Sequence, residues 1–336
     1  MKRIALEEHF STEELVALRS RGDAPQAAGK PGAAPTYSAM LAKSETGKRM
    51  LDLGEGRLAD MDRDGISVQV LCATGGLESL DPAEGTALAQ RANDAVAKVV
   101  RQHPARFAAY AALAPQDPKA AAHELERAVK KLGLVGGKIN SNVRGEYLDN
   151  PKYWEIFAAA EELGVPIFIH PAFPSPKMLP AFQGYPVLHG SIWGYAADTG
   201  LHAMRLICSG VFDEYPRLKI VLGHMGEALP FWLWRIDNRW TRENAPAQLT
   251  RKLRKKPGEY VRENFWVTTS GQFSVPALLC AYMTLGADRI LFAVDYPHED
   301  SAEAVAFLDA APISPADREK IYHGNAEGLL GLAADA

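Results

Sequence analysis

The sequence predicts an α/β fold, specifically a (β/α)8 TIM barrel in one domain spanning residues 1–336. Short apolar runs typical of strands alternate with longer stretches of helical periodicity, and eight such strand and helix units fit within 336 residues. No G-x-G-x-x-G turn precedes a predicted helix, which argues against an open dinucleotide-binding sheet. Repeated units of this kind favour a closed barrel.

The predicted strands are rich in β-branched or aromatic residues and mostly apolar on both faces, as parallel strands covered by helices are. In chain order they are Arg3–Leu6, Val68–Cys72, Phe107–Ala111, Gly136–Asn140, Pro166–His170, Leu218–Leu222, Phe265–Thr269 and Ile290–Val294. Several of the helices between them begin at or just after a proline and end at a glycine. The clearest are Ala83–His103, Pro118–Leu132, Pro151–Leu163 and Val275–Leu285.

Two inserted loops interrupt the repeat. Arg21–Pro35 follows the first strand, and a proline-rich stretch from Pro171 to about Trp193 follows the fifth. In a TIM barrel both loops lie on the C-terminal face, where active sites are built. We expect them to form substrate walls or lids, the alternative being surface decoration or a subunit contact.

Composition excludes several classes of protein. The 37 lysines and arginines against 41 acidic residues leave a net charge of −4, so no basic surplus favours nucleic acid as a partner. No apolar run approaches the roughly 18 to 20 residues of a membrane span, and the N-terminus lacks a signal-peptide core. Three scattered cysteines make no disulfide framework. These features predict a cytoplasmic protein.

Polar residues gather at the C-terminal ends of the predicted strands. Glu7 and His9 follow the first strand, His170 ends the fifth, and His224 and Asp295 follow the sixth and eighth. Because Glu7 and His9 are two apart, an extended backbone places them on one face and turns Glu8 away. Converging imidazoles and carboxylates suit a divalent metal with open positions. Four other histidines show no such convergence: His103, His123, His202 and His323. His189, in the proline-rich loop, is ambiguous.

Specific motifs link the chain to a known family. They are Ile4–Phe10 with its Glu7-x-His9 pair, Ile169–Pro171, Gly223–Glu227, Trp234–Asp237 and Asp295–Pro297. Together they resemble the amidohydrolase-2 branch of the metal-dependent amidohydrolases, over nearly the whole chain. That group contains the aminocarboxymuconate-semialdehyde, γ-resorcylate and 5-carboxyvanillate decarboxylases, of which the last two types are the most similar.

The resemblance implies a site residue by residue. Glu7, His9, His170 and Asp295 match the family's metal ligands, and His224 with Glu227 match its motif pair beside the metal. Asp295 would also be catalytic: in decarboxylating members it delivers a proton to the ring carbon, and in hydrolytic members it takes one from metal-bound water. The implied cofactor is one divalent ion, zinc or manganese with magnesium as a further option, and no organic cofactor.

Two arginines match substrate-binding positions of the family, and several aromatic residues lie near the expected mouth of the barrel. Arg57 and Arg235 suit a substrate carboxylate, because a guanidinium bonds both of its oxygens. The alternatives are an exposed helix charge for Arg57 and an ion pair with Asp237 or a neighbouring helix for Arg235. His298 stands where the compared types have an aromatic residue and adds a hydrogen-bonding group. The aromatic side chains expected to sandwich a flat ring, or else to pack the barrel, are Phe10, Phe173, Trp193 and Tyr296.

Lys138 lies on the fourth predicted strand, where amidohydrolases outside this branch carry a carbamylated bridging lysine. Because Glu7 is present instead, we expect a site with one metal and a structural or pocket-edge Lys138.

The leading hypothesis is a metal-dependent, non-oxidative decarboxylase of a hydroxylated aromatic carboxylic acid. A hydrolase or hydratase acting on a lactone, an amide or a related cyclic compound uses the same residues and is the first alternative. A non-catalytic metal-binding protein is the second. The expected partners are the small aromatic acid and further copies of the chain, since the family favours a homodimer or homotetramer.

Overall fold

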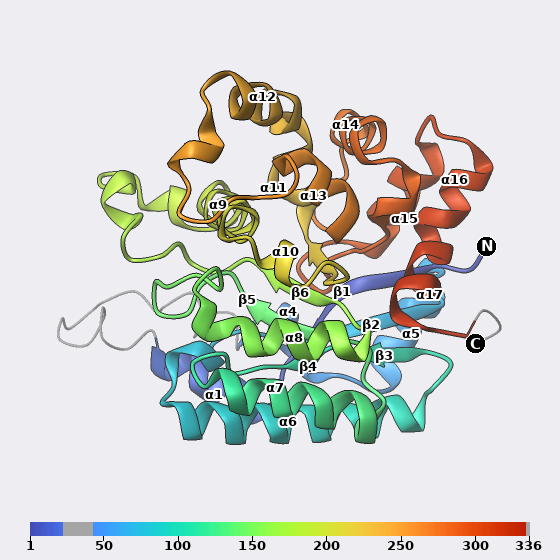
Figure 1. Cartoon of the computed structure of the whole chain (residues 1–336). Helices are drawn as coiled ribbons and strands as arrows, with labels where there is room; N and C mark the ends of the chain where they lie inside the picture. Colours follow the sequence, from blue (N-terminus) through green and yellow to red (C-terminus); the bar gives the residue numbers. More distant parts are fainter. Residues whose placement is uncertain (23–42, 334–336) are drawn as a thin grey trace.

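The computed structural model, which describes residues 1–22 and 43–333, is a barrel of parallel strands surrounded by helices (Figure 1). Its strands are β1 Ile4–Phe10, β2 Val68–Ala73, β3 Phe107–Ala109, β4 Ala111–Ala112, β5 Gly137–Asn140, β6 Ile167–His170, β7 Ile220–Leu222, β8 Phe265–Thr268 and β9 Ile290–Leu291. They pair in the orders β1 to β3 and β4 to β9. β3 and β4 together are the predicted third strand, interrupted at Tyr110.

Backbone hydrogen bonds close the barrel between its first and last strands. Leu6 N donates to Phe292 O at 3.1 Å, and His9 N donates to Tyr296 O at 2.7 Å. At the other junction Tyr110 N donates to Leu71 O, and Ala111 N donates to Gly136 O. Eight strand positions therefore form one closed ring, which confirms the predicted fold class.

The helices begin and end where the turn residues predict. A proline occupies the first turn of α6, α7 and α14, and Gly133 and Gly164 end two helical segments in the left-handed conformation. The helices are α1 Glu13–Gly22, α4 Glu45–Leu51, α5 Glu55–Asp64, α6 Pro82–Gln102, α7 Pro118–Arg127, α8 Trp154–Leu163, α9 Gly194–Ser209, α10 Val211–Glu214, α11 His224–Glu227, α12 Leu229–Arg242, α13 Pro257–Asn264, α14 Val275–Leu285, α15 Ser301–Ala310, α16 Pro315–Glu319 and α17 Asn325–Leu330. Short 3₁₀ or π turns complete them: η1 Leu77–Ser79, η2 Ala128–Leu132, η3 Pro151–Tyr153, η4 Leu179–Phe182, η5 Pro186–His189, η6 Ala245–Gln248, η7 Ala287–Arg289 and η8 Lys320–Gly324.

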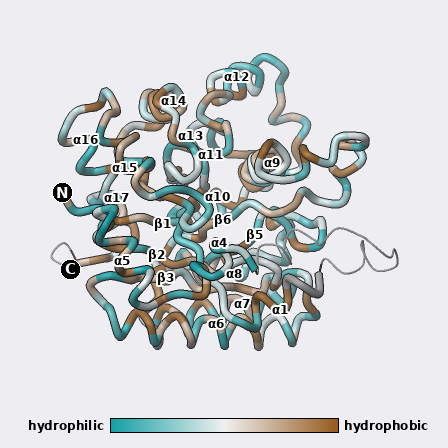
Figure 2. The backbone as a smooth tube through the Cα atoms, turned by 180° about the vertical axis from the view of Figure 1, so that it is seen from behind, coloured by the Kyte–Doolittle hydropathy of each residue, from teal (hydrophilic) through white to brown (hydrophobic). Residues whose placement is uncertain are grey.

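Helices cover the barrel with their apolar faces inward. Figure 1 shows α6, α7 and α8 on one side of the strands and α12 and α14 on the opposite side. Hydrophobic and hydrophilic residues alternate along α6 (Figure 2), whose buried face includes Leu88, Ala92 and Val96. No helix within residues 1–22 and 43–333 has the length and apolarity of a membrane span.

Apolar side chains fill the barrel interior, so it is no pore. Ile4 and Leu6 of β1, Val70 of β2 and Phe168 of β6 belong to one buried cluster with Leu329 of α17. An ion pair between Lys2 and Glu327, 2.8 Å apart, also ties α17 to the start of the chain. Because this end of the barrel is packed and covered, the opposite end, where the strands finish, is left for polar groups.

The two predicted loops have different outcomes. The segment from Pro171 to Trp193 follows β6 and contains only the short turns η4 and η5, so it is the inserted loop that was predicted. Of Arg21–Pro35, the first two residues end α1, and the rest lies outside the described residues.

The first strand is longer than predicted and contains a bulge. β1 continues to Phe10, so the prediction that it ends at Leu6 is wrong. Ala5 pairs with Gln69, but Glu8 pairs with Leu71, which leaves one extra residue in β1. A bulge of this kind reverses which side chains face inward. Ile4 and Leu6 face the interior before it, and His9 faces inward after it.

Candidate active site

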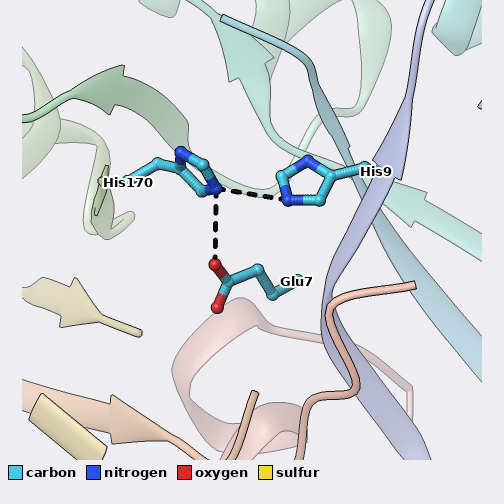
Figure 3. A group of neighbouring side chains, drawn as sticks. All are labelled: Glu7, His9 and His170. Carbon is cyan, nitrogen blue, oxygen red and sulfur yellow. Dashed lines mark hydrogen bonds and ion pairs between the residues drawn. The ribbon is translucent and has the colours of Figure 1, made fainter. Parts of the chain in front are cut away.

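Five predicted residues meet at the C-terminal end of the barrel. The metal-ligating atoms of Glu7, His9 and His170 all lie within 4.8 Å of one another, as do those of Glu7, His224 and Asp295. His9 and His170, from β1 and β6, point toward each other with their Nε2 atoms 3.2 Å apart (Figure 3). The four predicted metal ligands thus gather at one point, with Glu7 shared by both groups.

Asp295 lies between two imidazoles of this cluster. Its Oδ1 is 2.9 Å from His9 Nε2, and its Oδ2 is 3.7 Å from His224 Nε2. Glu7 Oε1 is 3.5 Å from His170 Nε2. Among the described residues, Glu7 Oε1 and Asp295 Oδ1 are buried without a hydrogen-bond partner. Such orphaned anionic oxygens facing imidazole nitrogens fit a divalent cation.

His9 and Glu8 are each held from outside the cluster. Cys72 Sγ lies 3.3 Å from His9 Nδ1, on the far side of the ring from Asp295 and His170, and so helps to orient Nε2 toward them. Glu8 points away from the cluster, as predicted, and accepts hydrogen bonds from Val294 N at 3.0 Å and Tyr296 N at 3.3 Å. These bonds fasten the segment that carries Asp295.

Burial and mutual charge shift the pKa values of the cluster residues. Burial raises the pKa of Glu7 to about 7. For His170, burial together with the nearby Lys138 and His9 lowers the pKa well below its usual value. For Asp295, burial acts upward, but the neighbouring imidazoles of His224 and His9 outweigh it and lower the pKa below the usual range.

His224 and Glu227 are brought together by an unusual turn. α11 is left-handed, with φ of 49° at His224, 57° at Met225, 53° at Glu227 and 64° at Ala228. This turn places His224 Nδ1 2.9 Å from Glu227 Oε1. Burial opposes the charged imidazole, but Glu227, Glu7 and Asp295 together raise the pKa of His224 well above its usual value. These carboxylates therefore favour the cationic form of His224 beside Asp295.

The left-handed turn stores strain that a glycine removes. Replacing the exposed Ala228 (φ 64°) with glycine is expected to stabilise the protein by about 1 kcal/mol, because left-handed backbone costs a non-glycine residue about 1–2 kcal/mol. Ala306→Gly, at an exposed site in α15, should instead destabilise it by about 0.5–1 kcal/mol. Urea unfolding of both variants measures the difference. Equal destabilisation by both would contradict the assignment of strain to this turn.

Arg57 and Tyr296 are buried and contact each other. Arg57 is fully buried, and its guanidinium donates to His9 O, Gln69 Oε1 and Asp52 O. It also lies 4.7 Å from the centre of the Tyr296 ring, whose hydroxyl donates to Asp60. The two side chains hold each other and the β1 backbone in this structure, and their contact with a substrate stays a prediction. Phe10 likewise packs in the apolar core.

Arg235 and Trp193 line a groove that begins beside Glu227. The groove has a volume of about 460 Å³, runs between α9 and α12, and is walled by Leu201 and Trp232 as well. Asp237 accepts a hydrogen bond from Gly258 N and lies 4.0 Å from Arg262, so it is not the partner of the exposed Arg235. Arg235 and Trp193 thus lie in a groove that reaches the cluster at Glu227, and they are not part of the cluster itself.

Of the other predicted substrate-binding residues, His298 lies at the rim of the cluster and Phe173 lies in the loop that follows β6. The His298 ring is exposed and packs edge-on against His9, with ring centres 5.5 Å apart. Phe173 is exposed, packs edge-on against Tyr195, and has its carbonyl oxygen bonded by Asn142.

Lys138 is buried on β5, and its ammonium donates to Asn140 Oδ1 at 2.7 Å. This placement is in keeping with the structural or pocket-edge role expected for it.

Two hydroxyl residues next to Glu7 were not among the predicted site residues. Thr268 and Ser270 both contact the Glu7 carboxylate from the end of β8. Their spacing of two residues at a strand end is the same signal that identified Glu7 and His9. Serine and threonine are common in such positions, so residue type alone did not mark them.

Fold and site together define a metal-binding α/β barrel with a mixed histidine and carboxylate cluster at its C-terminal face. The family model described as "Amidohydrolase" matches residues 46–332, and the chain belongs to this family, as its motifs predicted.

Several characterised proteins are similar over the full length. Gamma-resorcylate decarboxylase from Polaromonas sp. strain JS666 is 39% identical over 340 residues, covering 98% of each chain. The crystal structure of 5-carboxyvanillate decarboxylase from Sphingomonas paucimobilis has a TM-score of 0.90 and 39% identity, covering 99% of each chain. That of a dihydroxybenzoic acid decarboxylase from Polaromonas sp. JS666, with bound manganese and the inhibitor 2-nitroresorcinol, has a TM-score of 0.88 and 38% identity, covering 99% of this chain and 98% of that one.

Proposed function

We propose that this protein is a divalent-metal-dependent, non-oxidative decarboxylase of a hydroxylated aromatic carboxylic acid. The observation that carries the proposal is the position of Asp295, whose carboxylate lies between His9 and His224 at the open end of the barrel. Full-length similarity to decarboxylases of hydroxybenzoate-type acids supports this reaction over the hydrolase, hydratase and non-catalytic alternatives.

Glu7, His9, His170 and Asp295 would hold the metal ion. When bound, the ion supplies a Lewis acid that attracts the oxygens of the acid substrate. Manganese in the related structure makes Mn²⁺ our first choice, and Zn²⁺ and Mg²⁺ also accept nitrogen and oxygen ligands to some degree.

In the proposed reaction, the ionised Asp295 carboxylate first takes the proton of the substrate hydroxyl and then delivers it to the ring carbon that bears the carboxylate. The bond between that carbon and the carboxylate then breaks, its electron pair returns to the ring, and carbon dioxide leaves. His224, kept cationic by Glu227, would stabilise negative charge on the substrate hydroxyl. Arg235, Trp193, Phe173 and His298 would bind the outer part of the substrate.

We further propose that residues 1–336 act as one cytoplasmic domain that assembles as a homodimer or homotetramer. Large apolar side chains are exposed along α12 and the neighbouring α14, with Phe231 72%, Trp234 74% and Met283 83% accessible. Patches of this kind mark protein contacts, and a second copy of the chain would cover this one. Three free cysteines are compatible with a reducing compartment.

A panel of hydroxybenzoates and carboxyvanillate-like acids, assayed for carbon dioxide release with Mn²⁺-loaded enzyme, tests the function. We expect release of one carbon dioxide per product from at least one ortho-hydroxy acid. Running the assay in oxygen-18 water separates the alternatives, because a hydrolase or hydratase introduces solvent oxygen into its product. Labelled product without carbon dioxide would overturn the proposal.

A further inference from the structure

We infer that Thr268 and Ser270 form a positioning pair that holds one oxygen of Glu7 and leaves the other for the metal. The inference rests on the proposed function, since it concerns how the chain prepares its metal site. Neither residue needs to touch the ion or the substrate for this role.

Both hydroxyls contact the same carboxylate oxygen. Ser270 Oγ donates a short hydrogen bond to Glu7 Oε2, and Thr268 Oγ1 lies 3.2 Å from that oxygen. The two hydroxyls are 2.7 Å apart, and all three residues are fully buried. Glu7 Oε1 instead faces His170 Nε2 at 3.5 Å and lacks a hydrogen-bond partner in the described part of the chain. One oxygen of the Glu7 carboxylate thus contacts the two hydroxyls, and the other faces the cluster.

Ser270 also connects the two halves of the cluster. Its Oγ accepts a hydrogen bond from His224 N at 3.2 Å while donating to Glu7. A continuous chain of hydrogen bonds therefore runs from the strained turn at His224 to β1. Glu7 is the residue common to both groups of potential ligands, so this chain fixes the orientation of one group relative to the other.

Gly223 leaves room for the Glu7 carboxylate in this position. A Cβ atom at residue 223 would lie 3.0 Å from Glu7 Oε2, 3.3 Å from Oε1 and 3.5 Å from Ser270 Oγ. A side chain there would crowd the carboxylate. The space around the Glu7 carboxylate is therefore bounded by the backbone of Gly223 on one side and by the hydroxyls of Thr268 and Ser270 on the other.

Without the hydroxyl pair, the Glu7 carboxylate can rotate, and binding a metal must then restrict that rotation. Removing an outer partner of a metal ligand typically lowers metal affinity about 10- to 100-fold. The polar pair acts on the carboxylate directly, so its effect should appear in metal binding without any substrate.

The test is calorimetric titration of Mn²⁺ into the whole, chelator-treated protein. Ser270→Ala is expected to raise the dissociation constant about 10- to 100-fold, and Thr268→Val about 3- to 10-fold. Thr268→Ser keeps the hydroxyl and should stay within about threefold of the unmodified protein. If Ser270→Ala does not fold, the isosteric Thr268→Val and its hydroxyl-retaining partner still decide the question.

Thr269→Val is the matched control. Thr269 is equally buried and lies between the pair, but its hydroxyl donates to Ala293 O rather than to Glu7. This change should lower stability and leave Mn²⁺ affinity unchanged. Unchanged affinity in Ser270→Ala and Thr268→Val, or an equal loss in Thr269→Val, would overturn the inference alone. Failure of the unmodified protein to bind Mn²⁺ would overturn the proposed function with it.

Discussion

Replacing Asp295 with asparagine is expected to lower the rate of carbon dioxide release by on the order of 10³-fold, because the amide cannot deliver the proton to the ring carbon. Asparagine is also the substitution that best preserves the fold. Asp295 has φ of 79°, and asparagine tolerates this region far better than alanine does. The variant should therefore unfold within a few degrees of the unmodified protein.

The measurement is kcat at saturating Mn²⁺ with the substrate that the panel identifies, since loss of the Asp295 charge also weakens metal binding. Asp288→Asn is the control: Asp288 is an exposed aspartate that pairs with Lys320 at 2.8 Å and precedes β9, whereas Asp295 follows that strand. It should keep full activity. Normal turnover by the Asp295 variant would rule out this carboxylate as the proton donor.

Removal of the metal is the second change with a large expected effect. Dialysis against a chelator should reduce carbon dioxide release to the background rate, and Mn²⁺ should restore it. Rebinding should also release a proton at Glu7. Burial raises the pKa of Glu7 to about 7 in the metal-free protein, so this carboxyl is largely protonated at pH 6 and largely ionised at pH 8. The metal takes the ionised form.

Because the metal takes the ionised form of Glu7, binding of Mn²⁺ should depend on pH. Apparent Mn²⁺ affinity should rise as the pH increases from 6 to 8, and the proton released per metal by Glu7 should approach one at pH 6 and fall toward zero at pH 8. Calorimetry in two buffers of different ionisation enthalpy counts these protons. Glu126→Gln, which alters an exposed carboxyl on α7, should not change the count. Equal proton release at both pH values, or full activity without metal, would contradict the assignment.

Much of the site was accessible from sequence because strand ends in a parallel barrel meet at one face. Glu7, His9, His170 and Asp295 were predicted to converge, and the structure brings them within a few ångströms. The prediction needed only the positions of apolar runs and the rule that their C-terminal ends share a face. The assignment of individual roles to these residues remains part of the proposal.

Local sequence did not show how the arginines and aromatic residues are packed. Arg57 and Tyr296 have chemistry suited to an aromatic acid, yet both are buried and hold each other. Whether a guanidinium meets solvent or a backbone carbonyl depends on helix packing, which the sequence pattern does not show. Ser270 illustrates the converse, since its contact with Glu7 joins residues that lie 263 positions apart.

The sequence by itself determined the barrel, the order of its strands and the face on which the polar residues lie, because these follow from apolar periodicity and parallel topology. Only the tertiary structure decided the direction in which the side chains of the cluster point. The extra residue between Ala5 and Glu8 turns Glu7 and His9 inward, and the left-handed turn at His224 brings it to Glu227. Both features run against local backbone preference and persist because the surrounding packing and hydrogen bonds hold them in place.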